Sequence, residues 1–176
     1  ARIACVNCHV GEGARGMEYN AWGDPPNPPE HEANLVFTRM LAGPFDFTPG
    51  VLSLKGKGGR PLQSTLAKQL ANYVILYAPL QMAADLPENY RRYPAPFQFI
   101  KDVPTDWSQT LVPNGAVGDY VTIVRKDRNS DDWYLGSVTD ENARTLEVKL
   151  DFLDPDRNYR AQIYRDGANA DWRTHP

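Results

Sequence analysis

The sequence has little of what several function classes require. It contains only 2 Cys and 3 His among 176 residues, and its formal net charge of −3 comes from interspersed acids and bases. Charges mixed in this way give no basic surface for nucleic acid or for an anionic membrane. No apolar run reaches the length of a transmembrane helix, and no signal-peptide pattern opens the chain. Because the first residue is not Met, we expect an internal fragment of a globular protein.

The two cysteines form the one motif near the start. Cys5, Cys8 and His9 spell CxxCH, the attachment pattern of c-type haem, in which two thiols bind the haem and the His is an axial ligand. A haem also needs a second ligand and a wrapping helical domain, and none of the chain's methionines has a recognisable setting for that role. A free thiol pair, a disulfide or a coincidental match are the other interpretations. A lone CxxC lacks the second pair that a zinc site needs.

Residues 11–50 hold the side chains best suited to chemistry. Glu12 and Glu18 lie in a glycine-rich run, Tyr19 and Trp22 follow them, and His31 stands between two acids. Glycine allows positive φ and close approach to a ligand. Acids, an imidazole and aromatic faces are typical of a sugar-sized pocket. An exposed acidic loop with ordinary turn chemistry is the alternative on composition alone.

The first half of the chain predicts helices separated by loops. Prolines make Asp24 to Pro29 a loop. A short helix is predicted from His31 to Leu41, where Gly43 and Pro44 end it. Phe45 to Phe47 has the pattern of a short buried strand. The clearest helix runs from Ser64, its predicted cap, to Leu76. Its apolar stripe consists of Leu66, Leu70 and Val74.

The second half changes to a period of two after a predicted domain boundary near Tyr93 to Pro96. Apolar and polar residues alternate in four segments separated by turn residues, which predicts antiparallel strands with one wet face in a β-sandwich or half of one. These segments are 120–124, 133–138, 146–150 and 159–164. Asp102, Asp106 and Trp107 precede this sheet, and we interpret them as structural.

Blocks of sequence from Glu12 to Trp172 carry a resemblance to a known family. They are EGARGMEYNAW, NPPEHE, FTRMLAGPFDFTPG, QLANYVILYAPLQMAADLPENY, FIKDVPTDW, GDYVTIVRK, WYLGSVTDE, LDFL and YRAQIYRDG. In this order they resemble glycoside hydrolase family 97, the α-glucosidase and α-galactosidase group. The resemblance implies an α+β chain. Residues 1–95 would be the last (β/α) units of a TIM barrel, with an acid loop and the final barrel helix. Residues 96–176 would be an antiparallel β-sandwich-like domain that lacks its final strands.

The resemblance also implies roles for two acids. Glycoside hydrolysis needs a protonated carboxyl at the leaving oxygen and a second carboxylate as nucleophile or base. Glu18 matches the family's general acid, and Glu12 with Glu18 matches part of a calcium shell whose other ligands lie outside this chain. The second catalytic carboxylate has no match here. We therefore predict little or no activity for the chain alone, and retaining or inverting chemistry stays open.

Weaker hypotheses concern Trp22 and four residues that match family positions near the pocket, namely Arg15, His31, Arg39 and Asp46. His31, Arg39, Asp46 and Trp22 are the predicted substrate-binding residues, and Arg15 lies beside them. Each has a structural alternative. In these alternatives, Arg15 would pair with a loop acid, and His31 would be a loop histidine with its hydrogen bonds made within the protein. Arg39 and Asp46 would form a structural ion pair, and Trp22 would be an apolar anchor rather than a sugar-stacking platform.

Three functions follow from these observations. The first is a fragment of an α-glycosidase acting on an oligosaccharide, periplasmic or secreted by resemblance, with sugar and linkage undetermined. The second is a non-catalytic module in which the sandwich mediates self-association or carbohydrate contact. A partial barrel would also expose the stripe of Leu66, Leu70 and Val74, which favours oligomerisation or aggregation. The third is a c-type haem protein.

Overall fold

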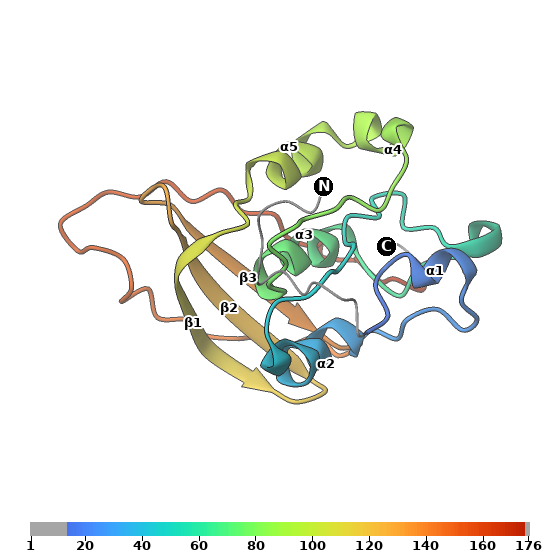
Figure 1. Ribbon diagram of the computed structural model, residues 1–176, viewed down its shortest axis with the longest axis horizontal. Coiled ribbons are helices and arrows are strands. Elements are labelled where there is room, and N and C mark those ends of the chain that lie inside the picture. Colours follow the sequence, from blue (N-terminus) through green and yellow to red (C-terminus); the bar gives the residue numbers. More distant parts are fainter. Residues whose placement is uncertain (1–13, 175–176) are drawn as a thin grey trace.

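The computed structural model describes residues 14–174 as an α+β arrangement (Figure 1). Helix α3 lies against the sheet, α4 and α5 lie together at the upper side of the view, and α2 lies at the lower end of the strands (Figure 1). The helices are α1 (Tyr19–Trp22), α2 (His31–Phe37), η1 (Arg39–Ala42), η2 (Lys57–Gly59), α3 (Leu66–Ile75), α4 (Pro87–Arg92) and α5 (Pro94–Asp102). No helix in this part of the chain is long and apolar enough to cross a membrane.

The sheet is a three-stranded antiparallel meander. Strands β1 (Trp107–Ala116), β2 (Tyr120–Asp127) and β3 (Trp133–Thr139) are hydrogen-bonded in the order β1-β2-β3. Gly118 takes a φ of 84° in the turn between β1 and β2, a value that favours glycine. The central strand is buried at successive positions from Val121 to Arg125, so both of its faces are covered. The prediction of a sheet with one wet face is therefore wrong for β2.

Helix α3 is the element that the sequence predicted best, with one shift at its start. The Thr65 hydroxyl, rather than Ser64, caps it by accepting a hydrogen bond from Lys68 N at 3.2 Å. The Ser64 hydroxyl instead accepts a hydrogen bond from Gln69 Nε2 at 2.8 Å. The side-chain oxygen of Gln69, Oε1, accepts hydrogen bonds from the backbone N–H groups of residues 50 and 51. The helix is thereby fixed to the chain segment that precedes it.

In the apolar stripe of α3, Leu70 and Val74 are buried and Leu66 is half-buried, which corrects the expected self-association surface. Leu70 and Val74 are 3% and 1% exposed, and the helix packs on β2 and β3. Leu70 packs with Leu52 and Tyr90, and Val74 packs with Val103 and Trp107, so the chain itself covers both side chains and they are not available to a second copy. The expectation that this helix surface drives oligomerisation is therefore wrong.

Several predicted strands are not strands, and some helices were not predicted. Residues 45–47 form no strand, although Phe45 and Phe47 are fully buried. Residues 146–150 and 159–164 are largely exposed and join no ladder in the described part of the chain. An alternating pattern becomes a strand only where a partner supplies the hydrogen bonds. Strand β1 and helices α4 and α5 were missed, because their polar and proline-rich sequences hide the period.

Candidate active site

The loop around Glu18 is held by side-chain amides from within itself. Asn20 is buried, donates from Nδ2 to Met17 O at 3.0 Å, and accepts the backbone N–H of Asn27 on Oδ1 at 3.0 Å. Asn27 in turn donates from Nδ2 to Gly16 O at 2.9 Å. Because both amides bond to backbone atoms, they fix the loop's path on either side of Glu18. The proline-rich segment thus returns to the loop around Glu18, residues 14–27, which we call the acid loop.

Glu18 stands at the start of the single-turn helix α1, with its carboxylate folded back over Gly16. A Cβ atom at Gly16 would lie 2.3 Å from Glu18 Oε2 and 2.6 Å from Oε1. Any side chain at position 16 would therefore displace the carboxylate. The neighbouring Met17 is buried in the main core, which anchors the backbone while Glu18 itself stays half-buried.

His31 reaches the same loop from the first turn of α2. Its Nε2 lies 2.6 Å from Arg15 O, and the Arg15 guanidinium lies 4.8 Å from the centre of the Tyr19 ring. The structure therefore brings the His31 side chain to the backbone of Arg15, in the loop that carries Glu18. It also gives His31 a backbone partner, which is what the structural interpretation of this residue requires.

Arg39 and Asp46 belong to a neighbouring part of the chain. Arg39 donates from Nη1 to Gly43 O at 3.3 Å and lies over the Phe45 ring at 4.9 Å. Asp46 is half-buried between the fully buried Phe45 and Phe47. These phenylalanines share a core with Met17, so the segments that carry Glu18 and Asp46 pack on the same interior.

Of the remaining predicted residues, only Trp22 lies in the described part of the chain. Trp22 is the last residue of α1. Glu12 and the CxxCH motif of Cys5, Cys8 and His9 lie outside the described residues. Among residues 14–174, no three His, Cys, Asp or Glu side chains gather as metal ligands. The described residues thus do not form a calcium shell by themselves, since Glu18 supplies a single carboxylate and calcium takes six to eight oxygens.

Sequence reasoning missed the polar residues that fix this loop from outside. Lys68 on α3 lies 3.4 Å from Glu32 Oε2, and both side chains are almost fully buried. The only signal was a Glu beside His31 and a Lys on the polar side of α3, and neither indicated burial. The local sequence pattern did not predict that Lys68 and Glu32 would form an ion pair, because this pairing depends on how α2 packs.

Comparisons with known proteins show that this chain is homologous to glycoside hydrolases. Residues 106–176 match the family described as glycosyl-hydrolase 97 C-terminal, oligomerisation. A retaining α-galactosidase of Bacteroides thetaiotaomicron is 36% identical over 167 residues, which cover 90% of this chain and 25% of that protein.

Solved structures extend the match over most of the chain. A glycoside hydrolase family 97 enzyme from Pseudoalteromonas sp. strain K8, solved with panose, shares 59% identity with a TM-score of 0.86, over 94% of this chain and 26% of that one. The same enzyme with acarbose gives 60% identity, a TM-score of 0.86 and the same coverage. The chain belongs to glycoside hydrolase family 97, and it spans about a quarter of the length of these relatives.

Proposed function

We propose that this chain is the part of an α-glycosidase that carries the general acid, Glu18, together with the domain that supports it. The observation that carries the proposal is the placement of the Glu18 carboxylate over Gly16, in a loop fixed by Asn20 and Asn27. A general acid must be held within hydrogen-bond reach of the leaving oxygen, so a fixed loop favours this role. Residues 1–95 would be the last units of a barrel, and residues 96–176 the C-terminal β-domain.

The remaining parts of the proposed site follow the same family match. Glu18 would protonate the leaving oxygen, while His31, Arg39, Asp46 and Trp22 would contact the sugar. The second carboxylate would come from the rest of the enzyme. Glu12 and Glu18 would contribute to a calcium shell completed from elsewhere, and no step is assigned to that ion. A periplasmic or secreted location suits an enzyme that acts on oligosaccharides.

The substrate class is proposed from the identities. The relative solved with panose and acarbose is 59–60% identical to this chain, whereas the retaining α-galactosidase is 36% identical. The higher identity favours an α-glucoside. Self-association of the C-terminal domain is a second proposed role, because the matching family is described by oligomerisation.

A chimera tests the role of Glu18. This chain would replace the matching quarter of the Pseudoalteromonas enzyme, and Glu18→Gln would be compared with the unsubstituted chimera. We expect kcat on panose to fall by about 10²- to 10⁴-fold, the usual contribution of a general acid. p-Nitrophenyl α-glucoside should lose less, because p-nitrophenolate leaves without a proton. Equal losses on both substrates, or retained turnover of panose, would contradict the proposal, as would a folded but inactive unsubstituted chimera.

A further inference from the structure

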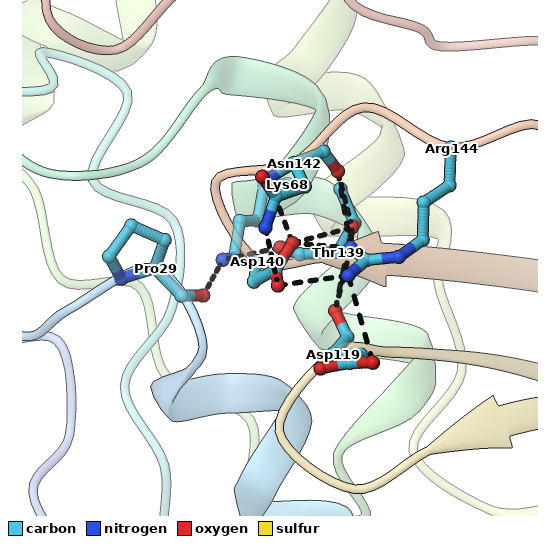
Figure 2. Close-up of polar contacts among 7 residues, drawn as sticks. All are labelled: Pro29, Lys68, Asp119, Thr139, Asp140, Asn142 and Arg144. Carbon is cyan, nitrogen blue, oxygen red and sulfur yellow. Dashed lines mark hydrogen bonds and ion pairs between the residues drawn. The ribbon is translucent and has the colours of Figure 1, made fainter.

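A buried lysine connects three elements that lie far apart in the sequence. Lys68 on α3 donates from Nζ to Pro29 O and, at 3.2 Å, to Thr139 O at the end of β3. Its charge is balanced by Glu32 on α2, 3.4 Å away, and the side chains of Lys68 and Glu32 are only 10% and 3% exposed. Figure 2 shows the lysine between Pro29 and the turn that follows β3.

One side of this contact leads to the acid loop. Pro29 and Glu32 flank His31, whose Nε2 lies 2.6 Å from Arg15 O. Two residues before Pro29, Asn27 donates to Gly16 O at 2.9 Å, and it is over Gly16 that the Glu18 carboxylate lies. The backbone that Lys68 holds is therefore the backbone that shapes the loop of the proposed acid.

The other side leads to a rigid end of the sheet. Arg144 contacts the Thr139 hydroxyl and forms an ion pair with Asp140, as Figure 2 shows. Asp140 N donates to Asp119 O at 2.7 Å, which joins this turn to the one between β1 and β2. The hydrogen bond from Arg144 holds the pKa of the Asp140 carboxyl well below its usual value, so the pair stays charged at neutral pH. Thr139 O is thus a fixed acceptor.

We propose that Lys68 is a positioning residue, which fixes the acid loop to the end of β3 through Pro29, Glu32 and Thr139. The C-terminal sheet then sets the position of the Glu18 carboxylate without contacting the sugar. This inference rests on the proposed role of Glu18. A cation suits the task because one ammonium group donates to two carbonyls while neutralising a buried carboxylate, and a neutral side chain of the same length does neither.

The variants are chosen to separate positioning from folding. Lys68→Met alone leaves the Glu32 carboxylate buried without its partner, so the main variant is Lys68→Met with Glu32→Gln, which removes both charges. Lys68→Arg keeps the charge and alters its geometry. Lys57→Met, at an exposed lysine of η2, is the matched control. All are made in the chimera and in the chain itself.

The kinetic readout is the ratio of kcat on panose to kcat on p-nitrophenyl α-glucoside. We expect the double variant to lower kcat on panose by about 10- to 100-fold, with KM little changed, because a misplaced acid costs most where the leaving group needs a proton. The loss on p-nitrophenyl α-glucoside should be several-fold smaller, and Lys68→Arg should lie between the double variant and the parent. Partial unfolding would lower both rates by one factor and leave the ratio unchanged.

Amide exchange in the chain itself provides a readout that needs no catalysis. In the double variant we expect residues 14–27 to exchange at least about tenfold faster, while the central strand β2 keeps its protection. If the double variant does not fold, Lys68→Arg carries the same two tests. A ratio that stays at the parental value, or loop exchange that does not change, would overturn the inference. If Glu18→Gln also left the ratio of kcat on panose to kcat on p-nitrophenyl α-glucoside unchanged, the result would refute the proposed function instead.

Discussion

At the scale of single residues, one buried arginine, Arg125, forms no ion pair with a carboxylate among residues 14–174 and is held by neutral oxygens instead. Arg125 is 4% exposed and donates from Nε to Val74 O at 2.6 Å, from Nη2 to Ile75 O at 3.2 Å, and from Nη1 to Thr110 Oγ1 at 3.0 Å. Two of these acceptors are the last carbonyls of α3, where a cation is favoured by the helix dipole. Burial lowers the pKa of Arg125 to about 10, which still leaves it charged at neutral pH.

Substitution of this arginine should be costly. Arg125→Lys keeps the charge but loses the planar fork, so at least one α3 carbonyl is left without a donor. We expect a loss of about 2–3 kcal/mol in the free energy of unfolding, measured by urea denaturation. The control is Arg128→Lys, because Arg128 pairs with Asp106 where both side chains are 54% exposed, and exposed pairs of this kind contribute little to stability. Equal losses for the two variants would contradict the assignment.

At the scale of elements, the contact between α3 and β3 depends on a missing side chain. A Cβ atom at Gly136 would lie 2.8 Å from Val74 Cβ and 2.9 Å from Ala71 O. The helix backbone therefore rests directly on the strand. This close approach covers Val74 and brings Lys68 to the end of β3.

Gly136→Ala tests this close approach. The added methyl group meets backbone as well as side-chain atoms, so it can be accommodated only if the helix moves. We expect destabilisation by about 1–3 kcal/mol, seen as a lower midpoint of urea unfolding. Gly167→Ala is the matched control, since no atom lies within 4 Å of a Cβ built there, and it should change stability by less than about 0.5 kcal/mol. If Gly136→Ala left the stability unchanged, the result would show that α3 and β3 are not in close contact at this position.

At the scale of the whole molecule, the proposed function gives the chain one carboxylate, Glu18, of the two that glycoside hydrolysis requires. A core that includes Met17 and Phe45 joins the acid loop to the sheet, so the piece has an interior of its own. Catalysis depends on several groups held at once, and an acid without its partner loses most of that advantage.

We therefore expect the isolated chain to be inactive. Incubation with p-nitrophenyl α-glucoside and p-nitrophenyl α-galactoside should give no release of p-nitrophenol above the blank, because the proposed function places the second carboxylate in the rest of the enzyme. The chimera at the same concentration is the positive control. Clear turnover by the isolated chain that Glu18→Gln abolishes would show that a complete site exists within it.

The sequence by itself determined the elements whose cause is local. The α3 stripe repeats at helical spacing, prolines at 25–29 exclude regular structure, and the strands at 120–124 and 133–138 alternate clearly, so each was predicted close to its observed bounds. Ordered blocks of residues also identified the family. The position of Glu18 in its loop was predicted in the same way, although its role there stays a proposal.

Only the tertiary structure decided which of these patterns pair. Residues 146–150 alternate as well as β2 does but join no ladder in the described chain, whereas the exposed, polar β1 does. Lys68 and Glu32 are ordinary surface residue types until α2 and α3 enclose them. A hydrogen bond or ion pair between distant segments depends on how close packing brings them, and that information is absent from any local stretch of sequence.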